Sequence, residues 1–301
     1  MSDVDQICVI GSGTMGAQIG LVSALAGYRT HLIDLSQEQL DAAREMLTKR
    51  TNRDVEKGRR TQSEVDEAWS RLSFTADRDA ALSEADFVIE AAVEDLGIKR
   101  ELFADLDRLT PEHAILATNS SNIVSSRIAD ATSRPEKVCN MHFFNPALVM
   151  KCVEVVPHEA TSKVTVDAAV TVAEAMGKSV VRLNREIPGF VANRLLNALR
   201  REALDLYDAG IASFEDIDTA AKTALGHPMG PFEIMDLVGI DVVHLIRLAE
   251  YEQTGAPEAL PHPLIRELYE AGRFGRKSGR GWYDYGDEGA GVSPGAASSK
   301  G

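Results

Sequence analysis

The chain has 301 residues, of which 44% are hydrophobic and 26% are charged. This balance is typical of globular proteins and excludes collagen-like, low-complexity and wholly disordered chains. With 32 Lys and Arg against 46 Asp and Glu, the formal net charge is −14, so neither nucleic acid nor an anionic membrane is an expected partner. The length suits two domains of about 100–200 residues each.

The cysteine usage favours the reducing cytoplasm. The cysteines Cys8, Cys139 and Cys152 are odd in number and far apart, which indicates neither a disulfide framework nor a zinc site. The N-terminus is acidic and lacks the basic segment of a signal peptide. Residues 7–28 carry no formal charge and are numerous enough to span a bilayer. Their glycines and polar residues instead predict a strand, a glycine turn and a buried helix.

As far as residue 187, short apolar runs alternate with longer amphipathic stretches. This alternation predicts an α/β domain with a mostly parallel sheet and helices on both faces. Ser36 with Gln39 resembles a capping box, and Gly177 is a typical helix end. The predicted strands are 7–11, 30–34, 87–91, 114–118, 138–142, 151–156 and 180–183, and the predicted helices are 15–26, 37–57, 99–109 and 164–176.

After Pro188 and Gly189 the pattern becomes helical, and a smaller all-helical domain is predicted. Helices are expected at 190–207, 213–224, 232–252 and 258–271, followed by an aromatic strand at 282–285. The last residues are rich in Gly, Ala and Ser, which indicates disorder. We therefore expect the α/β domain at 1–187, the helical domain at 188–285 and a disordered tail at 286–301.

A glycine loop joins the first predicted strand to the first predicted helix. The pattern is G-x-G-x-x-G, in which the first glycine permits a tight turn, the second lets a pyrophosphate approach, and the third allows close helix packing. The helix N-terminus offers N–H groups to the phosphates. The loop consists of Gly11, Ser12, Gly13, Thr14, Met15 and Gly16.

Asp34 ends the second predicted strand. A carboxylate at this place accepts hydrogen bonds from the ribose hydroxyls of NAD and repels the additional phosphate of NADP. The first domain is therefore expected to be Rossmann-like, with NAD as its cofactor. A glycine turn in a nucleotide-free α/β protein is the alternative, and the motif does not specify the reaction.

Polar clusters follow the later predicted strands, at 90–95 with Lys99, at 118–122 and at 142–146. Ligands of parallel sheets bind at these carboxyl ends. Glu154 lies inside an apolar strand and needs a partner, and among seven histidines His142 is the best candidate. A carboxylate makes imidazole a stronger base, so such a pair beside NAD is suited to removing a hydroxyl proton as hydride leaves. Spacing alone does not show that the two touch, and a core or surface histidine is the alternative.

Several longer segments resemble one enzyme family. They are GSGTMG, VIEAAVEDLGIK, TNSSNI, HFFNPALVMKCVEVV, PGFVANRLL, HPMGPFEIMDLVG and GRKSGRGWYDY, in this order between residues 7 and 285. Together they resemble the short-chain L-3-hydroxyacyl-CoA dehydrogenases, most closely the bacterial 3-hydroxybutyryl-CoA dehydrogenases.

The resemblance implies reversible, NAD-dependent oxidation of an (S)-3-hydroxyacyl-CoA, such as 3-hydroxybutyryl-CoA, to the 3-oxoacyl-CoA. It makes His142 the general base and Glu154 its partner. Ser121 and Asn193 would hold the reacting oxygen and the thioester, where donors stabilise developing negative charge. The implied NAD contacts are the loop 11–16, Asp34, Glu94, Lys99, Ser121, Asn145 and Lys277.

Residues 44–60 reverse the acidic character of the chain, with seven Lys and Arg against three Asp and Glu. Such a segment is suited to the phosphates of coenzyme A. The family binds CoA with a lysine in this region, for which Lys57 is the nearest match. This chain has Arg50 where some members use a serine, and Ser121 is a further substrate residue. A solvated helix face is the alternative.

The helical domain has more apolar residues than a small bundle is expected to bury alone. With the family resemblance, this predicts a homodimer through that domain, although packing among themselves is the alternative. The residues concerned are Phe190, Leu195, Leu196, Leu199, Phe232, Met235 and Leu237.

Two other functions are considered. One is a dehydrogenase of a free hydroxy acid, of the gulonate and lambda-crystallin type, and the other is a catalytically silent NAD-binding protein. The H-F-F-N-P motif and the basic segment favour the CoA enzyme over the first. The second is disfavoured because the whole set of expected site residues is present, namely Ser121, His142, Glu154 and Asn193. The sequence does not determine whether the acyl chain is simple or dicarboxylic. It also leaves open the pathway, β-oxidation or another, and the direction of flux.

Overall fold

Eight strands of the N-terminal part form one sheet in the order β3-β2-β1-β4-β5-β6-β7-β8. The structure is a computed structural model that describes residues 4–286, without the side chains of 253 and 254. All neighbouring strands are parallel except β6 and β7. This arrangement confirms the predicted Rossmann-like sheet. The strands are β1 (Gln6–Ile10), β2 (Arg29–Ile33), β3 (Leu72–Thr75), β4 (Phe87–Glu90), β5 (Ile115–Thr118), β6 (Val138–Phe143), β7 (Cys152–Val156) and β8 (Ser179–Arg182).

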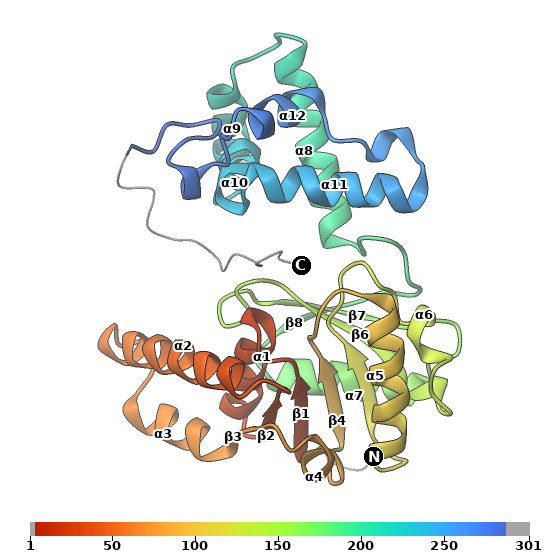
Figure 1. Cartoon of the computed structure of the whole chain (residues 1–301). Coiled ribbons are helices and arrows are strands. Elements are labelled where there is room, and N and C mark those ends of the chain that lie inside the picture. The colour runs from red at the N-terminus through yellow and green to blue at the C-terminus, as the bar shows by residue number, and fades with distance from the viewer. Residues whose placement is uncertain (1–3, 287–301) are drawn as a thin grey trace. The chain divides into compact units, whose positions relative to one another are not determined.

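Helices cover both faces of this sheet (Figure 1). Because side chains alternate along a strand, β1 sends Ile7 and Val9 into one apolar layer and Cys8 and Ile10 into the other. The first layer contains α1 (Thr14–Leu25), α2 (Gln37–Glu56), α3 (Gln62–Arg71) and α7 (Lys163–Ala175), and the second contains α4 (Arg78–Leu82), α5 (Leu96–Leu109) and α6 (Ser126–Ala129). A 3₁₀ turn, η1 (Pro135–Lys137), precedes β6.

Several elements of this sheet domain were not predicted, namely the short helices α4 and α6, the turn η1, the helix α3 and the strand β3. The helix α3 begins with a capping box in which Thr61 and Glu64 bond each other's backbone N–H. It leads directly into the edge strand β3, which is only four residues long and mostly half-buried. A short edge strand with one apolar side carries little periodic signal, which explains why the sequence pattern does not reveal it.

The chain divides into two compact units, Met1–Val191 and Ala192–Gly301. In the described part of the second unit every regular element is a helix, which confirms the predicted helical domain but not the strand predicted at its end. No helix within residues 4–286 is both long enough and apolar enough to cross a membrane. The elements are α8 (Ala192–Asp208), α9 (Phe214–Thr223), α10 (Pro231–Val238), α11 (Ile240–Thr254), η2 (Pro257–Ala259), α12 (Pro263–Glu270) and η3 (Arg276–Ser278).

Three sequence predictions for the C-terminal part are wrong. The predicted helix 232–252 is two helices, because the backbone turns at Gly239 with φ +107°, a conformation that favours glycine. The predicted helix 258–271 starts only at Pro263, and Pro is well placed in a first helical turn. The predicted helix 190–207 starts only at Ala192. Phe190 lies before it with φ +47° and packs with Val156 and Leu183 in the first unit.

The predicted strand 282–285 is also absent, and only isolated bridges involving Arg280 occur there. The N–H groups of Trp282 and Tyr283 both donate to the carboxylate of Asp236, at 2.9 Å each. A buried side chain therefore satisfies the backbone groups that a strand would have used. Of the predicted disordered tail, all but Gly286 lies outside the described residues.

Candidate active site

The glycine loop between β1 and α1 has three glycines with different structural roles. Gly11 has φ +95°, and an added Cβ would lie 2.7 Å from the carbonyl oxygen of Ala91. A Cβ on Gly16 would lie 1.9 Å from the carbonyl oxygen of Gly11. A Cβ on Gly13 would meet no protein atom within 4 Å. The fold therefore requires the first and third glycines, whereas the second leaves room for a ligand to approach the backbone.

Asp34 follows β2 and contacts this loop directly. Its Oδ2 accepts hydrogen bonds from the N–H and the hydroxyl of Ser12, at 2.8 and 2.9 Å, and its Oδ1 accepts from the N–H of Ser36 at 3.0 Å. The first turn of α1 has neither a side-chain cap nor an acidic residue, so this helix N-terminus is suited to binding an anion. The loop, the uncapped helix and the nearby carboxylate fit a dinucleotide such as NAD.

His142 on β6 and Glu154 on β7 are register partners in the one antiparallel pair of the described sheet. Their side chains share one face, and Nδ1 of His142 lies 2.9 Å from Oε2 of Glu154. With the carboxylate accepting at Nδ1, the other nitrogen, Nε2, is the one that can receive a proton. The predicted pair is therefore in contact.

The surroundings hold this pair in place. Glu154 is fully buried, and its Oε1 accepts from the N–H of Val191 at 2.9 Å. The imidazole of His142 packs between the rings of Phe144 and Phe190, with centroids 4.5 and 5.5 Å away. A buried carboxylate with both oxygens hydrogen-bonded and a histidine fixed by two rings have little freedom to move.

The loop after β5 carries Ser121, which is half-buried. Asn140, a fully buried residue of β6, organises this loop: its Oδ1 accepts from the N–H of Ser125 at 2.7 Å, and its Nδ2 donates to the carbonyl of Ser120 at 3.2 Å. Sequence reasoning missed Asn140. Its signal is the same as that of Glu154, a polar residue inside an otherwise apolar strand.

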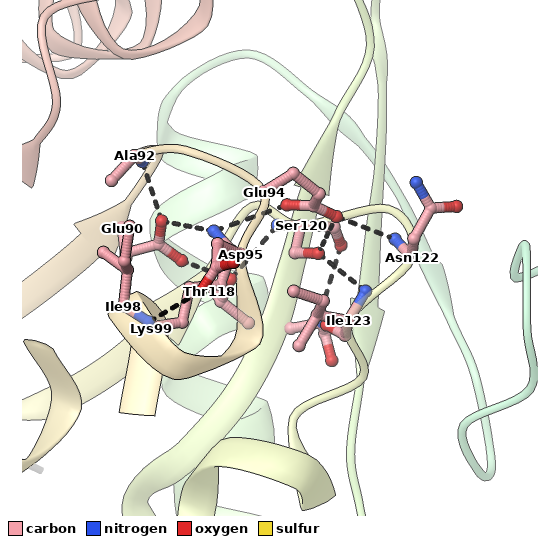
Figure 2. Close-up of polar contacts among 11 residues, drawn as sticks. Glu90, Ala92, Glu94, Asp95, Ile98, Lys99, Thr118, Ser120, Asn122 and Ile123 are labelled. Atoms are coloured by element: carbon pink, nitrogen blue, oxygen red, sulfur yellow. Dashed lines mark hydrogen bonds and ion pairs between the residues drawn. The ribbon is translucent and has the colours of Figure 1, made fainter. Parts of the chain in front are cut away.

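The predicted residues Glu94 and Lys99 lie in one polar network at the ends of β4 and β5 (Figure 2). Nζ of Lys99 lies 2.5 Å from Oε1 of Glu90 and 3.4 Å from Oε2 of Glu94. The hydroxyl of Ser120 donates to Glu94. Lys99 is only 1% exposed, so its ammonium group is held inside the protein rather than on the surface. Sequence reasoning assigned no role to Glu90 or Ser120.

The remaining predicted site residues lie in the loop after β6, on α2 and in the helical unit. Asn145 is exposed in the loop after β6. On the basic helix α2, Arg50 is paired with Asp54 at 2.9 Å, whereas Lys57 is exposed at the helix end. Asn193 and Lys277 belong to the helical unit, where Nζ of Lys277 lies 2.6 Å from the carboxylate of Asp241. Their assigned contacts with ligands in the first unit stay predictions.

The three cysteines are free thiols with raised pKa values. Burial raises the pKa of the Cys8 and Cys139 thiols to about 12. Burial, with a further contribution from the charge of Glu154, also raises the pKa of Cys152. A thiol acts as a nucleophile only as the thiolate, so all three are expected to be inert near neutral pH.

The fold and the glycine site together define the class, a dinucleotide-binding protein of the Rossmann type. Residues 6–187 match the NAD binding domain of 3-hydroxyacyl-CoA dehydrogenases, and residues 189–285 match their C-terminal domain. The chain belongs to the 3-hydroxyacyl-CoA dehydrogenase family. This confirms the resemblance and NAD as the cofactor.

Individual relatives agree with this assignment. The probable 3-hydroxybutyryl-CoA dehydrogenase of Bacillus subtilis is 41% identical over 283 residues, covering 94% of this chain and 98% of that protein. The solved (S)-3-hydroxybutyryl-CoA dehydrogenase of Ralstonia eutropha has a TM-score of 0.87 at 32% identity, covering 95% of this chain and 100% of the other. A diketoreductase of dicarbonyl compounds, with the same coverage, has a TM-score of 0.84 at 30% identity.

Proposed function

We propose that this enzyme oxidises (S)-3-hydroxyacyl-CoA esters reversibly to 3-oxoacyl-CoA esters with NAD, and that 3-hydroxybutyryl-CoA is among its substrates. The observation that carries the proposal is the 2.9 Å contact between His142 and the buried Glu154 in a chain of this family. A histidine held by a carboxylate is a suitable general base for a hydroxyl group.

In this mechanism Nε2 of His142 takes the proton of the C3 hydroxyl. NAD, when bound, accepts the hydride that leaves C3, so that the C–H and O–H bonds both break and a C=O bond forms. Glu154 stabilises the imidazolium that results, because its negative charge lies beside Nδ1. Ser121 and Asn193 are assigned to hold the reacting oxygen and the thioester carbonyl. In the reverse direction, His142 returns the proton to the oxygen.

We assign the coenzyme A phosphates to the basic helix α2. Lys57 is the best candidate because it is exposed, whereas Arg50 is partly neutralised by Asp54. The substitution Lys57→Ala should raise the KM for the CoA substrate severalfold and leave the KM for NADH unchanged. An unchanged substrate KM in a folded Lys57→Ala protein would count against this assignment and leave a solvated helix face.

The reaction itself is tested by following NADH absorbance with acetoacetyl-CoA. Rapid oxidation of NADH with the thioester, and not with free acetoacetate or with NADPH, is the expected result. The similarity to a diketoreductase makes a free dicarbonyl or hydroxy acid substrate the second candidate. Turnover of free acids without turnover of the thioester would select that alternative.

We also propose a cytoplasmic homodimer, in which the first domain binds NAD and the helical domain forms the dimer contact. The support is apolar exposure on the helical unit: Leu195 is 67% exposed, Leu245 50% and Ile246 48%. Phe232 and Met235, by contrast, are buried in the core of that unit. Light scattering after size-exclusion chromatography should give twice the chain mass of 32.6 kDa. A monomer at micromolar concentration would refute the dimer.

Participation in β-oxidation is an expectation from the family alone.

A further inference from the structure

Glu90, the last residue of β4, is a fully buried carboxylate with three hydrogen-bond donors around it. Oε1 accepts from Nζ of Lys99 at 2.5 Å and from the N–H of Ala92 at 2.7 Å. Oε2 accepts from the hydroxyl of Thr118 at 2.6 Å. Burying a charge is unfavourable unless the charge is paired and hydrogen-bonded. The three donors therefore compensate for the burial of this carboxylate at the carboxyl end of β4.

Lys99 links Glu90 to Glu94. It lies in the first turn of α5, its Nζ is buried between the two carboxylates, and its distance to Glu94 Oε2 is 3.4 Å. Glu94 is 39% exposed, so it is the member of the network that a ligand can reach. One ammonium group serves two carboxylates, and Glu90 is its nearer partner. Without Glu90, Glu94 would be the remaining ion-pair partner of Lys99 among the described residues.

Glu94 also holds the loop that follows β5 (Figure 2). Its Oε1 accepts from the hydroxyl of Ser120 and from the N–H of Asn122, the latter at 3.2 Å. Ser121 lies between these two residues in the chain. Glu90 and Thr118 are register partners on neighbouring parallel strands. The network therefore ties together the two loops that carry the predicted cofactor residue Glu94 and the predicted substrate residue Ser121.

We propose that Glu90 is a positioning residue for the NAD site. By pairing with Lys99, it leaves Glu94 bonded to Ser120 and Asn122 and so keeps both loops in their binding geometry. The inference rests on the proposed function, since it takes Glu94 and Ser121 to lie beside the bound cofactor. Loss of the Glu90 charge would draw Glu94 toward Lys99, because a buried ammonium group needs an anion.

The test is the affinity for NADH, measured by fluorescence titration of the purified full-length protein. Glu90→Gln keeps the shape of the side chain and removes its charge. We expect a Kd for NADH raised by about tenfold, a raised KM for NADH, and a kcat with acetoacetyl-CoA changed much less. The matched control is Asp167→Asn, which removes a carboxylate paired with Lys163 on α7, and its Kd should equal that of the wild type.

A second comparison separates positioning from simple destabilisation. If Glu90 acts through Lys99, Glu90→Gln should weaken NADH binding in the wild type but not in a Lys99→Met background. An unchanged Kd in a Glu90→Gln protein that merely melts at a lower temperature would overturn the proposal. So would an equal loss of affinity in both backgrounds. NADH binding requires no turnover, so failure of the proposed reaction would be seen separately, as a wild-type protein that binds NADH and leaves the thioester unchanged.

Discussion

His142 and Glu154 face each other across β6 and β7, with Nδ1 2.9 Å from Oε2. The two residues are 12 positions apart in the chain. Direct partners in an antiparallel pair place their side chains on the same face of the sheet. The register of β6 against β7 is therefore the feature that brings the predicted general base and its predicted partner into contact.

The first prediction concerns this pair. Glu154→Gln keeps a hydrogen-bonding side chain and removes the charge that stabilises an imidazolium, so kcat should fall by about 10²-fold, and His142→Gln should lower it by about 10³-fold. Steady-state kinetics with acetoacetyl-CoA and NADH measure both values. The Kd for NADH should change little in either variant. A kcat within twofold of the wild type in His142→Gln would exclude it as the base.

The second prediction uses two glycines of the same loop as a matched pair. Gly13→Ala should fold with an unchanged melting temperature, because its Cβ meets no protein atom within 4 Å. It should bind NADH at least tenfold more weakly, because the motif brings the pyrophosphate against the backbone at this glycine. Gly16→Ala should lower the melting temperature, because its Cβ would lie 1.9 Å from the carbonyl oxygen of Gly11. Differential scanning calorimetry and NADH titration distinguish the two. Equal effects of both substitutions would contradict this division of roles.

The third prediction concerns Asp236 in the helical unit. Its carboxylate accepts from the N–H groups of Trp282 and Tyr283 at 2.9 Å and from the hydroxyl of Tyr285 at 3.0 Å. Asp236→Ala leaves these buried donors unsatisfied and should reduce the free energy of unfolding by about 3 kcal/mol. Urea unfolding in a Trp69→Phe background, with Trp282 as the only tryptophan, measures this loss.

The control for that measurement is Asp284→Ala. The Asp284 side chain is 72% exposed, and its ion pair with Arg280 is long, at 3.6 Å, and lies on the surface. Its free energy of unfolding should stay within about 0.5 kcal/mol of the wild type. Similar losses in the Asp236 and Asp284 variants would show that burial of the carboxylate is unimportant.

The fourth prediction concerns pH. The pKa of the Asp86 carboxyl is lowered below its usual 3.8. Burial alone would raise this pKa, but hydrogen bonds from the N–H groups of Gln6 and Asp5 and from the ring of His113 outweigh the effect of burial. A carboxyl whose pKa is lower in the folded state stabilises the fold above its unfolded pKa and loses this contribution as pH falls through the folded value. Asp86→Asn should therefore unfold about 1–2 kcal/mol more easily near neutral pH. The difference should shrink below about pH 3.8, as urea unfolding at several pH values would show. A difference independent of pH would contradict the role of the charge.

Some of the site is readable from neighbouring residues alone. The glycine spacing at 11, 13 and 16, and the carboxylate at the end of the second strand, have direct steric and electrostatic meanings. In the structure Gly11 and Gly16 leave no room for a Cβ, and Asp34 accepts a hydrogen bond from the loop. Apolar periodicity likewise identifies most strands and helices, because burial of one face is a local pattern. Where one residue changed the backbone direction, as Gly239 does, periodicity continued across the break and the predicted helix was too long.

The amino-acid sequence by itself determined the class of fold, the glycine loop and the acidic residue predicted to select NAD, because each depends on residues close together in the chain. Only the tertiary structure decided which distant polar groups meet. The contact of His142 with Glu154 follows from strand register, and the burial of Lys99 between Glu90 and Glu94 follows from the packing of α5 on the sheet. Such contacts depend on burial and long-range pairing, whose free energies are properties of the whole fold and leave only a faint local mark, a polar residue in an apolar strand.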